Sequence, residues 1–347
     1  MAFTAKDSRG FSSLLSTPVP SAYTPTQILT YLDHVQFPLP LTFPRTPETL
    51  TLLHRLQITT IPYDNLSLHY NPSHDNSIHP QDLFNKFITP PPGSRGRGGY
   101  CFENATFWLN ILRGLGFTAY ASQARIRLRD GPVPRGDFVG PRHVIIIVHF
   151  GDGQRWSSDV GFGGDGPTSP LRLEERESGG TGDEGAVTNL GSQQVRISRG
   201  QFPGTVDAGR NQFWFYEYRN GREVEWNRYY AFADVEAGSW DLEAANWWVQ
   251  THPESFQRKG LLLVKFLRGK GGDVVNGEGE GVKQVEVVGK MMLADGVVKR
   301  NMGGKTEVVK VCRTEAERIG ALKEHFGISL TDEEREGIRG FETELRG

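Results

Sequence analysis

The stretch RGRGGYCFEN (95–104) places Cys101 directly after a run of glycines and at the start of an apolar pattern with helical spacing. A cysteine at a helix N-terminus faces unpaired N–H groups and the positive end of the helix dipole, which lower the thiol pKa and favour the nucleophilic thiolate. Glycines let the backbone turn sharply and leave room for a substrate. Backbone N–H groups near such a turn are also suited to stabilise an oxyanion. The local pattern therefore makes Cys101 a candidate nucleophile.

Three other roles are open to this cysteine: a small buried hydrophobe, half of a disulfide, or a metal ligand. The chain has only one further cysteine, Cys312, and disulfides are rare in chains with a cytosolic character. Neither cysteine has a second one at zinc-ligand spacing. The glycine run matches neither a phosphate-binding P-loop nor a dinucleotide fingerprint. A buried structural cysteine remains the main alternative to a nucleophile.

A nucleophilic cysteine needs a base, and the base needs an orienting group. His143 opens the apolar strand pattern RHVIIIVHF. If residues 151–153 form a three-residue hairpin loop, Ile145 faces Asp159, and His143 becomes a diagonal neighbour of Asp159 on the same face, about 7–8 Å away. A two-residue loop would place Asp159 on the opposite face. A strand-end histidine and a turn-capping aspartate are the alternatives for the two residues.

The elements that must position these residues divide the chain into three parts. Helical patterns with Thr-Pro starts predict a helical bundle over 1–116, which ends in the helix of the nucleophile. Alternating and β-branched runs predict a mostly antiparallel β domain over 117–232. Mixed signals over 233–347 predict an α/β subdomain, and the fold class is therefore α+β. The glycine-rich segments 174–190 and 268–281 are expected to be exposed insertions.

The composition describes an ordinary globular protein. The 347 residues are 37% hydrophobic and 23% charged, with a net charge of −2. This balance disfavours nucleic acid or anionic lipid as a main partner. The longest apolar runs are far too short to span a membrane. The N-terminal residues lack the apolar core of a secretion signal, so we expect a cytoplasmic protein.

Three motifs in this order, RGGYCFEN, RHVIIIV and DVGFGG, resemble the arylamine N-acetyltransferase family. The segments TTIPYDNLSLH, SPLRL and EHFGISL are also similar to that family, so the resemblance spans about residues 25–335. It implies a catalytic triad of Cys101, His143 and Asp159 on a cysteine-protease-like core. It also implies a helical bundle, a β-barrel-like domain and an α/β lid.

The resemblance implies a ping-pong reaction with acyl-CoA as co-substrate and no metal. Cys101 would take the acyl group as a thioester, and an arylamine or arylhydrazine would then remove it. His143 would act as the base, and Asp159 would fix the imidazole tautomer and favour its charged form. Acetyl-CoA is the expected donor, while propionyl and malonyl donors stay open. Xenobiotic metabolism is the implied setting; the physiological amine and the oligomeric state are left open.

The resemblance also assigns supporting residues. Arg97 and Asp64 are expected to form a buried charge-assisted contact that positions the cysteine loop. Gly140, Phe162 and Gly163 are expected to line the acyl and CoA pocket. Ordinary turn formation and packing are the alternative for each of them.

Two other classes of function share parts of this pattern. Transglutaminases and papain-like cysteine proteases carry the same ordered Cys, His and Asp set, and they act on peptide or glutamine groups without CoA. A catalytically silent binding module with the same fold is the second alternative. Transfer of an acyl group from CoA to an amine is the favoured hypothesis, because all three triad residues are present.

Overall fold

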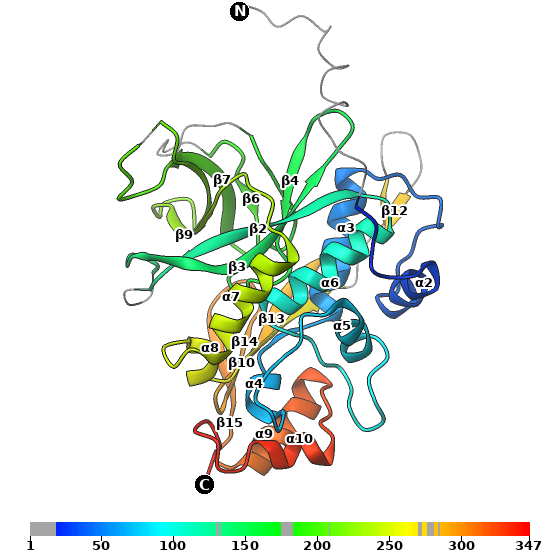
Figure 1. The fold of residues 1–347 in the computed structure, drawn as a ribbon, viewed down its shortest axis with the longest axis vertical. Coiled ribbons are helices and arrows are strands. Elements are labelled where there is room, and N and C mark those ends of the chain that lie inside the picture. The colour runs from blue at the N-terminus through cyan, green and yellow to red at the C-terminus, as the bar shows by residue number, and fades with distance from the viewer. Residues whose placement is uncertain are drawn as a thin grey trace, which may run out of the picture.

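The N-terminal part of the chain is a group of helices. The computed structural model describes residues 19–129, 131, 133–174, 183–207, 209–269, 273–275, 281–283 and 285–347. In Figure 1 these helices lie to the right of the large sheet. The helices of this part are α2 (Pro25–His34), α3 (Pro47–Thr60), α4 (Ser67–Tyr70), α5 (Pro80–Phe87) and α6 (Cys101–Gly114).

The sequence explains where these helices begin. Thr24 and Thr46 cap α2 and α3 by accepting hydrogen bonds from N–H groups of the first turn, and a proline follows each as the first helical residue. Helix α6 is buried along almost its whole length, and Phe107, Trp108 and Ile111 of this helix lie in the largest hydrophobic core cluster. Cys101 is therefore the first residue of a helix that is fixed in the core.

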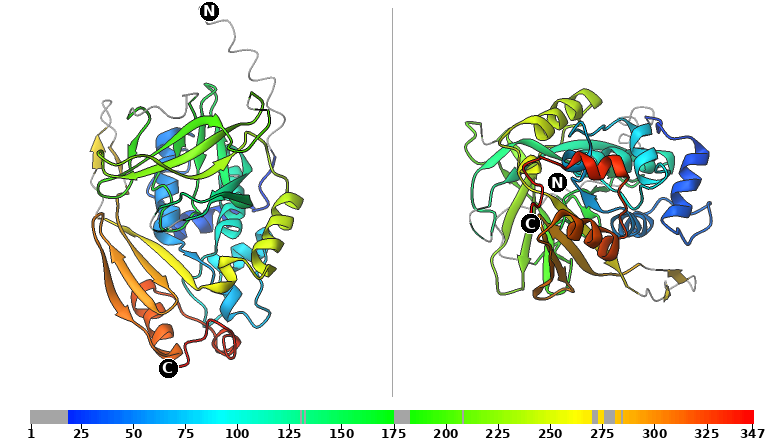
Figure 2. Two further views of the ribbon diagram at one scale, coloured as in Figure 1. Left: turned by 90° about the vertical axis from the view of Figure 1, so that its left-hand side faces the viewer. Right: turned by 90° about the horizontal axis from the view of Figure 1, so that it is seen from below.

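An eight-stranded antiparallel sheet forms the middle of the molecule, with the strand order β5-β4-β3-β2-β9-β8-β7-β6. The sheet curls, as the views of Figure 2 show, and α6 packs against β2 and β3. Its strands are β2 (Thr118–Arg127), β3 (Phe138–His149), β4 (Arg155–Ser158), β5 (Leu171–Arg172), β6 (Val187–Thr188), β7 (Gln193–Gln201), β8 (Gln212–Asn220) and β9 (Asn227–Phe232).

The hairpin between β3 and β4 has the predicted register. Phe150 donates its N–H to the carbonyl of Gln154 across the loop, and Ile146 is opposite Ser158. The three-residue loop 151–153 is therefore confirmed. The pairing stops at Ser158, so Asp159 starts a loop instead of continuing the strand.

A second antiparallel sheet covers one end of the molecule, with the order β1-β10-β13-β14-β15. Its strands are β1 (Tyr63–Asp64), β10 (Leu262–Arg268), β13 (Val287–Ala294), β14 (Val297–Asn301) and β15 (Thr306–Val311), and a small separate pair is formed by β11 (Asp273–Val275) and β12 (Gly281–Lys283). The helices of this part are α7 (Ser239–Thr251), α8 (Phe256–Lys259), α9 (Glu315–Ala321), the π-helical η1 (Leu322–Phe326) and α10 (Asp332–Gly337).

The short strand β1 connects the first and last parts of the chain. Tyr63 pairs with Val264 of β10, and it also forms a bridge with Gly99 in the loop before the cysteine. Asp64 donates its N–H to the carbonyl of Gly99 at 3.0 Å. The loop that leads into α6 is therefore tied to a sheet made mostly from the C-terminal third.

The prediction of an α+β fold with a helical part, a curled antiparallel sheet and a C-terminal α/β part is confirmed. The boundaries at 116 and 232 remain predictions. The expected insertions 174–190 and 268–281 fall partly outside the described residues, and the described part of the second one includes β11 and the first residue of β12. Within the described chain no helix has the length and apolar character needed to cross a membrane.

The close approach of the cysteine loop to β1 yields a test of the fold. A Cβ at Gly98 would overlap the carbonyl oxygen of Pro62 just before β1. We therefore expect Gly98→Ala to lower the free energy of unfolding by about 1–3 kcal/mol, measured by urea denaturation. Gly140→Ala is the matched control, because nothing lies within 4 Å of a Cβ at that position. Equal urea midpoints for Gly98→Ala and the wild type would contradict this packing.

Candidate active site

Cys101 is the first residue of α6 and only 5% exposed. Two contacts hold the turn before it: the Tyr100 N–H donates to Glu103 Oε2 at 3.1 Å, and Asn104 Nδ2 donates to the carbonyl of Gly99 at 2.6 Å. The thiol Sγ lies 3.7 Å from the backbone carbonyl oxygen of Arg142, to which it donates. The nucleophile candidate therefore faces the start of the apolar part of β3.

Two opposing influences set the pKa of the Cys101 thiol, and the sequence predicted only the one that lowers it. Backbone N–H groups of Cys101 and Phe102 lower the pKa of the thiol, as expected for a helix start. Burial is the larger influence and raises the pKa of Cys101, and the negative charge of Asp159 raises it further. A thiolate at this position therefore needs a positive charge beside it.

His143 and Asp159 form a buried pair at the same place. His143 Nε2 lies 2.7 Å from Asp159 Oδ2, and both residues are almost fully buried. The second carboxylate oxygen of Asp159 accepts the N–H of Gly161 at 3.0 Å. A carboxylate accepts only, so Nε2 carries a proton and Nδ1 is the ring nitrogen left to exchange a proton. The predicted proximity of the two residues is confirmed.

A chain of hydrogen bonds lies directly behind Asp159. Ser158 Oγ is 3.0 Å from His54 Nδ1 and accepts from Trp108 Nε1 at 3.0 Å. His54 Nε2 lies 3.1 Å from the carbonyl oxygen of Pro167, which can only accept, so Nε2 carries the proton and Nδ1 accepts from Ser158. Burial is the main influence on His54 and lowers its pKa to about 4. A neutral His54 therefore fixes the end of β4 next to Asp159.

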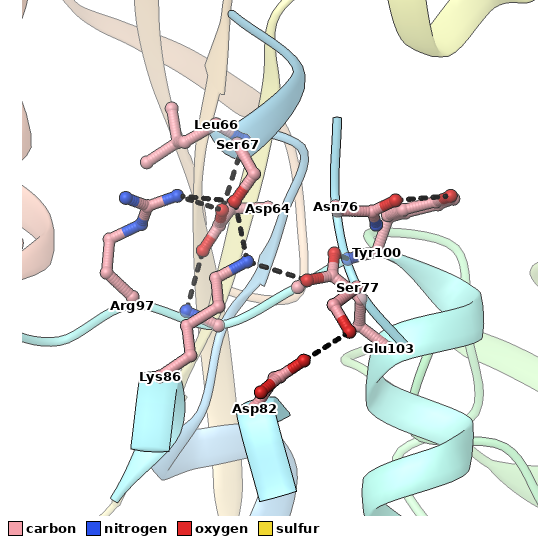
Figure 3. A network of polar contacts seen from close by, with 12 residues as sticks. Asp64, Leu66, Ser67, Asn76, Ser77, Asp82, Lys86, Arg97, Tyr100 and Glu103 are labelled. Carbon is pink, nitrogen blue, oxygen red and sulfur yellow. Dashed lines mark hydrogen bonds and ion pairs between the residues drawn. The ribbon is translucent and has the colours of Figure 1, made fainter. Parts of the chain in front are cut away.

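Arg97 and Asp64 lie in a polar network behind the cysteine loop (Figure 3). Arg97 Nη2 is 3.7 Å from Asp64 Oδ1, so the predicted contact is present. Asp64 also accepts the N–H of Gly98 at 2.7 Å, which holds the glycine turn directly. Arg97 makes a closer ion pair with Glu334 of α10 and donates to Ser67 at 3.1 Å. The network thus connects the loop to the C-terminal helix.

A second ion pair in Figure 3 fixes the first turn of α6. Lys86 of α5 donates to Glu103 at 2.7 Å and to Ser67 at 2.8 Å. Glu103 is almost fully buried and accepts the Tyr100 N–H with its other oxygen. Removal of Lys86 would leave a buried carboxylate without its counter-charge, which is costly. Lys86 and Glu103 are therefore positioning residues for Cys101.

A cavity of about 380 Å³ opens at these side chains. It lies between the curled sheet, the loop after β4, α7, α8 and the second sheet. Its walls combine aromatic side chains with a few charged groups. Lining residues include Cys101, His143, Tyr63, Ile126, Arg129, Arg142, Phe162, Gly163, Asp165, Tyr229, Trp248, Met292 and Lys299.

Phe162 and Gly163 line this cavity, as expected from the sequence. The Phe162 ring contacts the imidazole of His143 with a centroid distance of 4.9 Å. Gly140 is not among the residues that line this cavity, so its expected place in the acyl and CoA pocket stays a prediction. It lies three residues before His143 on β3, and an extended strand covers about 10 Å over three residues, which carries Gly140 away from Cys101.

Metal ligands do not gather in the described chain: among its residues no three His, Cys, Asp or Glu side chains are placed to hold a metal ion. Cys101 and Cys312 are both free thiols. The cationic side chains on the cavity wall, Arg129, Arg142 and Lys299, are the groups suited to hold an anionic co-substrate.

Comparison with known proteins identifies the family. The family model described as N-acetyltransferase matches residues 46–272, which is more than half of the chain. The chain belongs to the arylamine N-acetyltransferase family. Among its curated relatives, N-malonyltransferase FDB2 of Gibberella moniliformis is 27% identical over 343 residues, which cover 91% of this chain and 92% of that protein. The arylamine N-acetyltransferase of Mycobacterium tuberculosis is 29% identical over 294 residues, which cover 83% of this chain and 86% of that protein.

Solved structures of arylamine N-acetyltransferases share the fold. The enzyme from Mycobacterium abscessus superposes with a TM-score of 0.69 at 22% identity and covers 92% of this chain and 98% of its own. The enzyme from Mycobacterium marinum in complex with CoA gives a TM-score of 0.64 at 23% identity, covering 90% and 96%. At these identities the likeness establishes the fold alone.

Several residues of the site were not found by sequence reasoning. Glu103 stands three positions after the helix-capping Tyr100, which is the position of a capping-box glutamate, and this was an available signal. Glu334 belongs to the TDEE capping box, but the sequence does not indicate that its carboxylate reaches Arg97. His54 gave no signal, because nothing in its helical surroundings marks it as a neighbour of β4.

The buried neutral His54 predicts a pH dependence of stability. The unfolded chain takes up a proton near the ordinary pKa of 6.5, whereas folded His54 does so only near 4. The stabilisation is therefore complete above pH 6.5 and decreases as the pH falls toward 4. We expect wild type to lose about 2 kcal/mol more unfolding free energy than His54→Gln between pH 7 and pH 5.

Urea denaturation at several pH values measures this difference. His79→Gln is the control, because His79 is exposed and this variant is expected to keep the full pH slope of the wild type. Identical slopes for the wild type and His54→Gln would contradict the assignment of His54 as a neutral buried group.

Proposed function

We propose that this protein is an acyltransferase that moves a short acyl group from CoA to an arylamine or arylhydrazine through a thioester at Cys101. The observation that carries the proposal is the 2.7 Å contact between His143 and Asp159 in the cavity that Cys101 lines. Family membership and the relative named arylamine N-acetyltransferase support it. In this proposal Cys101, His143 and Asp159 are the catalytic residues.

Before the first half-reaction, His143 Nδ1 has taken the thiol proton of Cys101. The positive imidazole then stabilises the thiolate, and the buried carboxylate of Asp159 stabilises the imidazole. The thiolate attacks the carbonyl carbon of the acyl-CoA, a new C–S bond forms at Cys101, and the C–S bond to CoA breaks. His143 returns its proton to the CoA sulfur. The products are acyl-Cys101 and CoA.

In the second half-reaction the amine nitrogen attacks the same carbonyl carbon. His143 takes a proton from the attacking nitrogen, the bond to Cys101 Sγ breaks, and the amide leaves. The thiolate and the protonated imidazole are restored as the starting pair. The aromatic side chains of Phe162, Tyr229 and Trp248 give the cavity apolar walls suited to an aromatic ring.

The proposal also covers the acyl donor and the cellular setting of the reaction. A related enzyme was solved in complex with CoA, which supports acyl-CoA as the co-substrate. Acetyl is the first acyl group to test, because the mycobacterial relatives are named N-acetyltransferases. Small aromatic amines as partners, xenobiotic metabolism and a cytoplasmic location remain expectations from the family.

The test is the intact-protein mass after brief exposure to acetyl-CoA. The wild type is expected to gain the mass of one acetyl group and to lose it when an aromatic amine is added. Cys101→Ala is expected to gain none, since it lacks the attacking sulfur. Cys312→Ala is the matched control and is expected to behave like the wild type, because Cys312 lies in a separate core cluster.

Absence of any adduct on folded wild-type protein with acetyl-, propionyl- and malonyl-CoA would overturn this function. A peptide or glutamine substrate would then become the better hypothesis. An adduct that persists in Cys101→Ala would overturn the assignment of the nucleophile.

A further inference from the structure

Arg142 places a cation on the wall of the cavity that Cys101 also lines. It precedes His143 on β3, and its own carbonyl oxygen is 3.7 Å from Cys101 Sγ. Its guanidinium lies over the ring of Trp248 on α7, 3.4 Å from the ring centroid. Both side chains line the cavity. The stacking fixes the plane of the guanidinium and leaves its N–H edges available.

The charge of Arg142 is not neutralised by a neighbouring acid. Asp165 is the carboxylate on the described cavity wall, and Arg129 forms an ion pair with it. Lys290 approaches the same carboxylate at 3.9 Å. Within the part of the chain that the structure describes, Arg142 has no ion pair with Asp or Glu. Partial burial lowers the pKa of Arg142, and no carboxylate counteracts this influence.

A guanidinium with free N–H edges in a partly desolvated site is a strong receptor for a carboxylate, which it can bind through two parallel hydrogen bonds. A malonyl thioester carries a carboxylate one methylene away from the carbonyl carbon that Cys101 attacks. An acetyl thioester carries only a methyl hydrogen there. A guanidinium in the cavity that Cys101 lines therefore fits the malonyl group better than the acetyl group.

We propose that Arg142 binds the carboxylate of a malonyl group and makes malonyl-CoA the preferred donor. This inference rests on the proposed function. The relatives named N-malonyltransferase, which match over up to 91% of this chain, support it. In the step itself the C–S bond to CoA breaks, the C–S bond to Cys101 forms, and the thiol proton passes to the CoA sulfur. The malonyl carboxylate stays ionised and unchanged.

The test is the ratio of kcat/KM for malonyl-CoA to kcat/KM for acetyl-CoA, with the same amine acceptor. Arg142→Met is expected to lower this ratio about 30-fold or more, because a hydrogen-bonded charge pair is lost for one donor only. Arg142→Lys keeps the charge but not the planar fork, so its ratio is expected to lie between those of wild type and Arg142→Met. Acetyl-CoA turnover reports any general damage to the neighbouring nucleophile.

Arg125→Met is the matched control. Arg125 also stacks over an aromatic ring, that of Phe202, and it faces Pro141 on the neighbouring strand, but it does not line this cavity. Its donor ratio is expected to equal that of the wild type. An equal fall in the Arg125→Met ratio would overturn the assignment to Arg142.

The outcomes separate this inference from the proposed function. If acetyl-CoA acylates Cys101 and malonyl-CoA does not, the function stands and the inference is wrong. The inference is also wrong if Arg142→Met lowers both donors equally. If the variant changes only the preference for 4-aminobenzoate over aniline as acceptor, the carboxylate belongs to the amine, and the donor assignment is overturned. If neither donor acylates the wild type, the proposed function and this inference are both wrong.

Discussion

One electrostatic constraint governs the site: the thiol of Cys101 is buried in a place that disfavours its own ionisation. Burial and the charge of Asp159 both raise its pKa, and the helix N–H groups offset only part of this. A reactive thiolate is therefore possible only as part of a pair in which His143 holds the proton. The contact of His143 with Asp159 at 2.7 Å makes such a pair electrostatically acceptable in the interior.

Much of the fold serves to hold three backbone segments together at that pair. Helix α6 brings Cys101, the β3–β4 hairpin brings His143, and the loop after β4 brings Asp159. A Cβ at Gly161 would lie 3.0 Å from the Cα of Cys101, so the loop and the helix start are in close contact. The ion pairs Lys86–Glu103 and Arg97–Glu334 then fix the cysteine loop on the side away from the cavity. The second of them connects the loop to α10.

Local patterns predicted what depends on local geometry. The Gly-Asp-Gly loop determined the hairpin register, and the register places His143 and Asp159 together. Contacts between distant segments could not be predicted in this way. The ion pair between Arg97 and Glu334 joins residues far apart in the chain, and no local pattern marks it. The thiol electrostatics also depended on burial, which the sequence does not specify at one residue.

The thiolate–imidazolium pair is tested by the rate of Cys101 alkylation by iodoacetamide as a function of pH, in wild type and in Asp159→Asn. If His143 holds the thiol proton, the wild-type rate stays nearly constant from about pH 6 to pH 9, because the thiolate is already formed. Asp159→Asn should react slowly at neutral pH and become faster only under alkaline conditions. A wild-type rate that rises only under alkaline conditions, equal to that of Asp159→Asn, would contradict a thiolate–imidazolium pair.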